Sequence, residues 1–283
     1  MSIVIEHLNY VYMAGGPYET KALNDVNLTI GDGEFIGLIG HTGSGKSTLV
    51  QHLNGLVMPT SGRVLVDGMD LADKATDRRA IRQRVGLVFQ YPENQLFEET
   101  VEKDIAFGPK NLGLDENEIA RRVKDAMRRV ALDYDALHDR SVFELSGGQM
   151  RRVAIAGVLA MKPDVIILDE STAMLDPSGR QEVMNTVHRL NKEEGISVVI
   201  ITHYMAEAAT ADYVIVMDGG KIAMNGTPRE VFTQVERVRA LGLDVPPMTD
   251  LAHMLRENGV NVRADVLTVD EMVEEVCRLS SSN

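Results

Sequence analysis

Apolar residues form short runs in two parts of the chain, one before residue 90 and one after residue 164. The run at 165–168 is wholly apolar, as in a buried strand, whereas 3–12 alternates between apolar and polar residues, which is also typical of a strand. Both parts should therefore contribute strands to the fold. Strands are predicted at 3–12, 23–30, 34–39, 63–66, 85–89, 165–168, 197–202 and 213–217.

Between residues 91 and 163 the apolar residues recur at helical spacing instead. Ile119, Val123 and Met127 share one face of a predicted helix, and Asp115 can cap its first turn. We therefore expect a helical insertion at about 91–163. Strands and helices alternate after it, which predicts an α/β fold with a parallel sheet. Further helices are predicted at 46–53, 149–161 and 180–194.

The pattern changes again beyond residue 230. A helix is predicted at 249–258 with Leu251, Met254 and Leu255 facing inward, and Thr268 with Glu271 forms a capping box that opens a last helix. The sequence therefore predicts a main domain over 1–230 and a C-terminal helical extension over 231–283, a candidate dimerisation element.

Composition narrows the partners and the compartment. The 283 residues are 44% hydrophobic and carry a net charge of −13, which argues against a nucleic-acid partner. No apolar run has the length of a membrane span and the N-terminus lacks the features of a signal peptide, so we expect a cytoplasmic protein. The single cysteine, Cys277, excludes an internal disulfide and is expected to be a core thiol.

A glycine-rich loop between a predicted strand and a predicted helix fits the pattern G-x-x-x-x-G-K-[ST], which cradles phosphates. Lys46 is expected at the β- and γ-phosphates and Ser47 at Mg²⁺, while Gly43 and Gly45 allow close approach of the backbone. The predicted phosphate-binding residues are Gly40, His41, Thr42, Gly43, Ser44, Gly45, Lys46, Ser47 and Thr48.

Four polar side chains follow apolar strands whose carboxyl ends should meet at one edge of the sheet. Asp169 is expected to hold Mg²⁺ and Glu170 to polarise the water that attacks the γ-phosphate. His203 can donate to the γ-phosphate or steady Glu170 and the water. Gln90 can offer its amide oxygen to Mg²⁺ or to the water. Together with the phosphate loop, these residues predict a nucleotide triphosphatase.

The stretch Leu145–Gln149 identifies a family. With the motifs above, the chain resembles the nucleotide-binding subunits of ATP-binding-cassette (ABC) transporters, whose signature is Leu-Ser-Gly-Gly-Gln. The resemblance implies a P-loop cassette with a mixed sheet core, an antiparallel β subdomain and a helical subdomain. It also implies that two subunits face head to tail around two ATP molecules. Ser146, Gly147, Gly148 and Gln149 would then open a helix aimed at the ATP held by the other subunit.

A narrower resemblance covers 89–97, 104–111 and 146–161. These segments are similar to the ATPase subunits of energy-coupling-factor importers, which take up vitamins and transition-metal ions. His41-Thr42 and the insertion at 16–19 resemble the second of two paralogous ATPases. The resemblance implies a paralogous ATPase partner, a transmembrane coupling subunit, a separate substrate-binding membrane protein, and a peripheral position on the cytoplasmic face of the membrane.

An aromatic residue that stacks on adenine is also implied. Tyr12, at the end of the first strand, is the favoured residue, with Tyr10 as the alternative. The sequence departs from the family after Glu170, where Ser171 and Met174 replace the usual proline and glycine. Because glycine tolerates backbone angles that methionine does not, contact with the partner subunit or coupling to it is expected to be altered.

The sequence opposes two other functions. A soluble cassette ATPase acting on DNA would carry a long coiled coil between Gln90 and Ser146, and one acting on ribosomes would carry two cassettes. The sequence has neither feature. A non-hydrolysing regulatory subunit is opposed by the intact Glu170 and His203.

Overall fold

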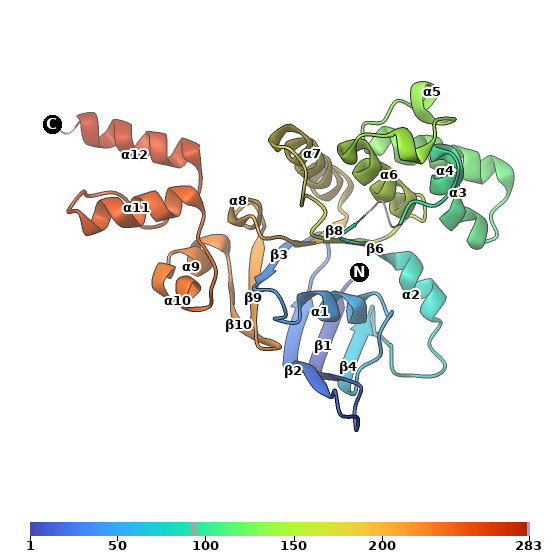
Figure 1. Ribbon diagram of the computed structural model, residues 1–283, viewed down its shortest axis with the longest axis horizontal. Helices are drawn as coiled ribbons and strands as arrows, with labels where there is room; N and C mark the ends of the chain where they lie inside the picture. Colours follow the sequence, from blue (N-terminus) through green and yellow to red (C-terminus); the bar gives the residue numbers. More distant parts are fainter. Residues whose placement is uncertain (92–94, 282–283) are drawn as a thin grey trace.

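The computed structural model describes residues 1–91 and 95–281, and its strands form two sheets (Figure 1). The smaller sheet is antiparallel, in the order β2-β1-β4-β5. This sheet is the antiparallel subdomain that the family resemblance implied. Its strands are β1 (Ile3–Tyr12), β2 (Thr20–Ile30), β4 (Ser61–Val66) and β5 (Met69–Asp70).

The larger sheet is mixed, in the order β10-β9-β3-β8-β7-β6, and only β10 is antiparallel to its neighbour. Its parallel strands read as apolar runs because helices or the second sheet cover both faces. In register, Ile201 lies opposite both Leu38 and Asp169, so three strands end at one edge. The strands are β3 (Phe35–Gly40), β6 (Val85–Val88), β7 (Val165–Asp169), β8 (Ser197–Ile201), β9 (Tyr213–Asp218) and β10 (Lys221–Gly226).

The two faces of the larger sheet are covered by different helices (Figure 1). Helix α1 (Lys46–Leu53) packs on one face, in a core shared with the antiparallel sheet. Helices α6 (Gly147–Leu159) and α7 (Pro177–Glu194) pack on the other face. The phosphate loop and the signature helix are therefore attached to opposite sides of the sheet.

In the segment predicted as a helical insertion, the described helices run from Val101 to Leu159, while 92–94 lie outside the described residues. The side chain of Asp115 accepts a hydrogen bond from the Glu118 backbone N–H at 3.0 Å, and the predicted apolar face of the helix that follows is buried. The helices are α2 (Arg78–Arg84), before the insertion, then α3 (Val101–Asn111), α4 (Glu116–Arg129), α5 (Tyr134–Leu137) and a 3-10 turn at Val142–Glu144.

The C-terminal part contains α8 (Met205–Ala208), α9 (Pro228–Phe232), α10 (Val235–Ala240), α11 (Pro247–Glu257) and α12 (Val269–Ser281). Residues of 231–245 share a buried cluster with β9, whereas α11 and α12 enclose a small separate cluster. We therefore propose that the boundary of the extension lies after Val245, instead of after residue 230. None of the helices in residues 1–91 and 95–281 combines the length and the hydrophobicity that a membrane span requires.

Two expectations about the extension were wrong. Met254 is exposed, because the inward face of α11 is formed by Ala252 with the half-buried Leu251 and Leu255. Cys277 is exposed and is not a core thiol. In both cases helical spacing located a helix without showing how little of its surface is covered.

Candidate active site

The loop 40–48 connects β3 to α1 at the edge where the parallel strands end. Gly45 caps α1 with φ of 105°, and a Cβ at this position would lie 2.7 Å from the carbonyl oxygen of Ala22. No side chain caps α1, and its first turn carries no acidic residue. The N–H groups of this helix end are therefore available to an anion, which fits a phosphate group.

Lys46 is buried, with 5% of its surface exposed, beneath this loop. Its Nζ donates to the carbonyl oxygens of Gly40 at 2.7 Å and His41 at 3.0 Å. Burial lowers the pKa of Lys46, while the carboxylates of Glu170 and Asp169 act in the opposite direction. The ammonium group thus contacts the loop and lies within electrostatic reach of Glu170, the predicted base, and Asp169, a predicted magnesium ligand.

His41 places both ring nitrogens beside acceptors. Nδ1 lies 2.8 Å from the carbonyl oxygen of Thr42, and Nε2 lies 2.8 Å from Oδ1 of Asp218 at the end of β9. These two contacts raise the pKa of His41 because both favour the protonated ring. Asp218 was missed by the sequence analysis, since it carries no motif and reaches the loop through strand pairing alone.

Two of the three predicted magnesium ligands lie together. Asp169 ends β7 and is buried, and the Ser47 hydroxyl donates a hydrogen bond to its carboxylate. Burial raises the pKa of Asp169, and the hydrogen bond from Ser47 opposes that shift. A carboxylate and a hydroxyl beside a phosphate-binding loop are oxygen donors of the kind Mg²⁺ prefers.

Glu170 holds the other strand-end residues around its carboxylate. Its Oε1 lies 2.8 Å from Nε2 of His203, and its Oε2 accepts a hydrogen bond from the side-chain amide of Gln90. Glu170 itself has φ of 50°, in the left-handed region, which turns its side chain out of the strand direction. Gln90, Glu170 and His203, which each follow a parallel strand, therefore form one contact group.

Arg151 on α6 was missed by the sequence analysis. It is buried, and its guanidinium donates to the carbonyl oxygens of Gln90 at 2.6 Å and Ala173 at 3.1 Å. One arginine thus fixes the backbone of Gln90, which contacts Glu170, and the backbone of the loop that follows Glu170. The only signal for this role was a cation close behind the signature stretch.

The signature residues form a tightly closed helix start. Ser146 caps α6 by accepting from the Gln149 N–H at 3.3 Å, and the Gln149 side chain accepts from the Ser146 N–H at 3.0 Å. Ser146 and Gly147 are exposed. Across residues 1–91 and 95–281, no hydrogen bond or ion pair joins 146–149 to the loop 40–48. In the described part of the chain, this helix start is therefore not tied to its own phosphate loop by any polar contact.

The two candidate adenine-stacking residues differ in exposure. Tyr12 is 39% exposed and its hydroxyl lies 3.1 Å from Oγ1 of Thr48, whereas Tyr10 packs edge-on against His52 and the core. The ring of Tyr12 is therefore accessible beside the phosphate loop, and Tyr10 serves the core.

Met174 adopts the conformation that glycine favours. Its φ is 63° and it is 85% exposed, on the loop that follows Glu170. A left-handed conformation costs a residue with a side chain about 1 kcal/mol or more. Because its side chain is so exposed, packing against the described residues offsets little of this cost.

The chain is similar in sequence to known ATP-binding proteins of transporters. A family model described as ABC transporter matches residues 23–173. The energy-coupling factor transporter ATP-binding protein EcfA2 of Clostridium perfringens is 52% identical over 284 residues, covering 100% of both chains. EcfA2 of Symbiobacterium thermophilum is 55% identical, covering 98% of this chain and 96% of its own. EcfA1 of Caldanaerobacter subterraneus is 52% identical, covering 96% and 98%.

Solved structures agree. CbiO1 from Clostridium perfringens, described as part of the ABC transporter complex CbiONQ, is 40% identical with a TM-score of 0.75, covering 90% of this chain and 98% of its own. The ATP-binding cassette MJ0796, in a dimeric post-hydrolysis state bound to ADP and phosphate, is 29% identical with a TM-score of 0.72, covering 80% and 98%.

Proposed function

Since the chain belongs to the ATP-binding subunits of ABC transporters, and among them to those of energy-coupling-factor transporters, we propose that it binds and hydrolyses ATP to drive import of vitamins or other micronutrients. The observation that carries the proposal is the contact group of Gln90, Glu170 and His203 beside the buried Lys46. Full-length relatives of the same class support the coupling to transport.

ATP is proposed to bind at the loop 40–48. The uncapped start of α1 and the ammonium of Lys46 would hold the β- and γ-phosphates, and the exposed ring of Tyr12 would stack on adenine. Ser47, Asp169 and the Gln90 amide oxygen would hold Mg²⁺. When bound, the ion neutralises charge that develops on the phosphates.

In the hydrolysis step, Glu170 is proposed to accept a proton from the attacking water. The water oxygen forms a bond to the γ-phosphorus, the bond from that phosphorus to the bridging oxygen breaks, and ADP leaves with the electron pair. His203 contacts one carboxylate oxygen of Glu170 and Gln90 contacts the other, and the two contacts together orient the carboxylate. This pre-set orientation reduces the reorganisation needed in the transition state.

Each site is proposed to be completed by a second ATPase subunit in a head-to-tail dimer. At the exposed helix start, the N–H groups of Gly147 and Gly148, which the capping box between Ser146 and Gln149 does not use, would bind the γ-phosphate held by the partner. A paralogue is the proposed partner, since relatives named EcfA1 and EcfA2 both match the full chain.

Replacing Met174 by glycine should change ATP turnover of the assembled complex by at least about twofold, because the loop then adopts its left-handed conformation without strain. The isolated chain should become more stable to unfolding by about 0.5 kcal/mol or more. Met174→Ala is the control, since it removes the side chain and keeps the strain. Unchanged turnover and unchanged ATP affinity in both variants would refute a role for this position.

A groove of about 640 Å³ between α2, α3 and α6 is proposed to receive the membrane coupling subunit. Phe89, Phe97 and Phe107 line it and are exposed, and the last two pack edge to face at 4.8 Å. Because Phe89 directly precedes Gln90, a segment seated here would reach the ATP site through the backbone. This contact would keep the protein at the cytoplasmic face of the membrane.

The extension is proposed to contact the second ATPase subunit. Val269, Val273 and Val276 are exposed along one face of α12, and the exposed Met254 lies on the neighbouring α11. The buried cluster of the extension consists of four residues, Ala252, Val262, Val266 and Met272. So small a core supplies little stability of its own, which favours an extension that is covered in the dimer.

Isolation of the complex through an affinity tag on this chain tests the proposal. From detergent-solubilised membranes, a second ATPase and two membrane proteins should co-purify, and the preparation should hydrolyse ATP. The soluble alternative predicts recovery from the cytosolic fraction with DNA or ribosomes and no membrane protein. The same tag on Lys46→Ala separates assembly from catalysis, because the same proteins should co-purify while ATP hydrolysis is lost.

A further inference from the structure

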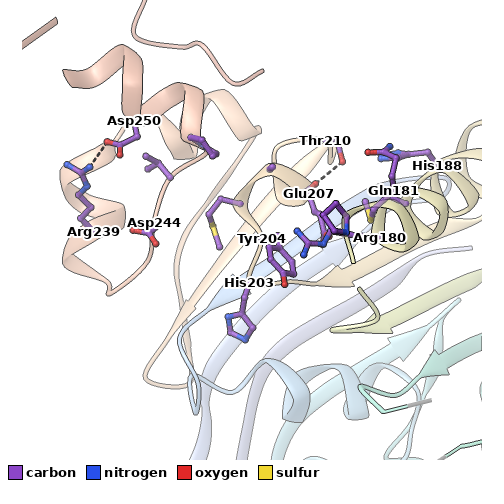
Figure 2. A pocket seen from close by; sticks show the side chains of 16 residues that line it. Arg180, Gln181, His188, His203, Tyr204, Glu207, Thr210, Arg239, Asp244 and Asp250 are labelled. Atoms are coloured by element: carbon purple, nitrogen blue, oxygen red, sulfur yellow. Dashed lines mark hydrogen bonds and ion pairs between the residues drawn. The ribbon is translucent and has the colours of Figure 1, made fainter. Parts of the chain in front are cut away.

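A cavity of about 780 Å³ lies between the start of α7, the segment after β8, and the connection from α10 to α11 (Figure 2). His203 forms part of its wall, so the cavity adjoins the proposed ATP site. Arg180, Tyr204 and Glu207 lie together on the cassette side of the cavity, as Figure 2 shows. None of these three residues has a role in the mechanism above.

Glu207 on α8 joins two catalytic loops through one oxygen atom. Its Oε2 accepts a hydrogen bond from Oγ1 of Thr172 at 2.9 Å and another from Oγ1 of Thr202 at 2.6 Å. Thr172 follows Glu170 by two residues, and Thr202 directly precedes His203. The carboxylate therefore fixes the loop after Glu170 relative to the segment that carries His203.

Burial makes these hydrogen bonds difficult to replace. Thr172, Thr202 and Glu207 are each more than nine-tenths buried, so water cannot substitute for a lost partner without rearrangement. Thr202 also accepts from the Tyr204 N–H at 3.0 Å, which directs its hydroxyl proton toward Glu207. The position of both threonine hydroxyls is thus tied to the Glu207 carboxylate.

The second carboxylate oxygen of Glu207 lies near a cation but forms no hydrogen bond with it. Its Oε1 has no hydrogen-bond partner and lies 3.9 Å from Nε of Arg180, whose guanidinium stacks on the Tyr204 ring at 3.5 Å from the centroid. Burial raises the pKa of Glu207, and the two threonine hydroxyls oppose this shift. The nearby cation offsets the buried charge while the threonines keep the carboxylate in place.

We infer that Glu207 is a positioning residue for ATP hydrolysis: by holding Thr172 and Thr202 on one oxygen atom, it sets the contact between Glu170 and His203. The inference rests on the proposed function and deepens it. The side-chain hydrogen bonds of Glu207 go to Thr172 and Thr202, neither of which is among the predicted ATP or magnesium ligands, so its removal should affect the chemical step and leave ATP binding largely intact.

The test compares steady-state ATP hydrolysis by assembled complexes. Glu207→Ala should lower kcat at least about tenfold and change KM for ATP by less than about twofold, because only the orientation of the catalytic groups is lost. Glu207→Gln keeps a carbonyl oxygen that accepts both hydroxyl protons, so it should retain at least about a third of the wild-type kcat.

Two threonine variants keep the inference testable if Glu207→Ala does not fold. Thr172→Val should lower kcat without raising KM, whereas Thr186→Val should leave both unchanged. Thr186 is the matched control, since it is equally buried and its hydroxyl donates only to a carbonyl oxygen of its own helix, at 2.9 Å. Effects of Thr172→Val and Glu207→Gln are measured on complexes of confirmed composition.

Three results would overturn the inference: a wild-type kcat in Glu207→Ala, a kcat of Glu207→Gln as low as that of Glu207→Ala, or equal behaviour of Thr172→Val and Thr186→Val. Failure of the proposed function is seen separately, as ATP turnover that survives Glu170→Gln. Loss of turnover in Glu170→Gln with no effect of Glu207→Ala contradicts the positioning role alone.

Discussion

Replacing Glu170 by glutamine is expected to lower ATP turnover of the assembled complex at least about 100-fold, the scale at which loss of a positioned general base is felt. His203 and Gln90 contact different carboxylate oxygens of Glu170. The glutamine oxygen can still accept from His203, and Gln90 can turn its side-chain amide so that its own oxygen accepts from the new NH2 group, so the contact group should persist. It cannot take a proton from water. ATP affinity should therefore remain close to that of the wild type.

The measurement is steady-state turnover together with equilibrium binding of ATP in the same preparation. Glu6→Gln is the matched control, because Glu6 lies on β1 of the antiparallel sheet and pairs with the exposed Arg63 on β4. Equal turnover by Glu170→Gln and wild type would exclude Glu170 as the base. A parallel loss of ATP affinity would instead make Glu170 a binding residue.

The catalytic residues were predictable because their signals are local. The phosphate loop is one contiguous motif, and Asp169, Glu170 and His203 each end an apolar run. In a parallel sheet such ends share an edge, so the topology converts separate runs into one site. The strands alone therefore predict that these side chains lie at one edge, without knowledge of the strand order.

Residues that act through tertiary contacts could not be predicted in this way. Arg151 and Asp218 reach the site from a helix and a strand end distant in sequence, and Glu207 joins two loops from the interior. Their neighbours are determined by tertiary packing, which leaves no regular spacing in the sequence from which the contacts could be predicted. The strained φ of Met174 was inferred only because the family usually has glycine at that position.

The domain boundary and the exposure of Met254 share a single physical reason. Periodicity identifies an apolar face but not what covers it, and the apolar residues of α9 and α10 are covered by the cassette. Those of α11 and α12 are covered in part. A small helical unit therefore shows the same sequence pattern whether its apolar face packs on a neighbouring core or is left partly exposed.

Ser146→Arg is expected to lower ATP turnover of the assembled complex about 100-fold, because a bulky cation would displace the helix start from the γ-phosphate of the partner's ATP. The helix itself should lose about 1 kcal/mol with its cap. Ser146→Thr, which can still accept from the Gln149 N–H, is the control for that loss and should retain most of the turnover.

The central claim is that Lys46 and Ser146 of this chain serve two different ATP sites. ATP affinity of the isolated Ser146→Arg chain, measured beside turnover of its assembled complex, tests this directly. The account predicts an affinity within about twofold of wild type while turnover is lost, since the phosphate loop and α1 are untouched. A fall in affinity that matches the fall in turnover would contradict it, by placing Ser146 in the same pocket as Lys46.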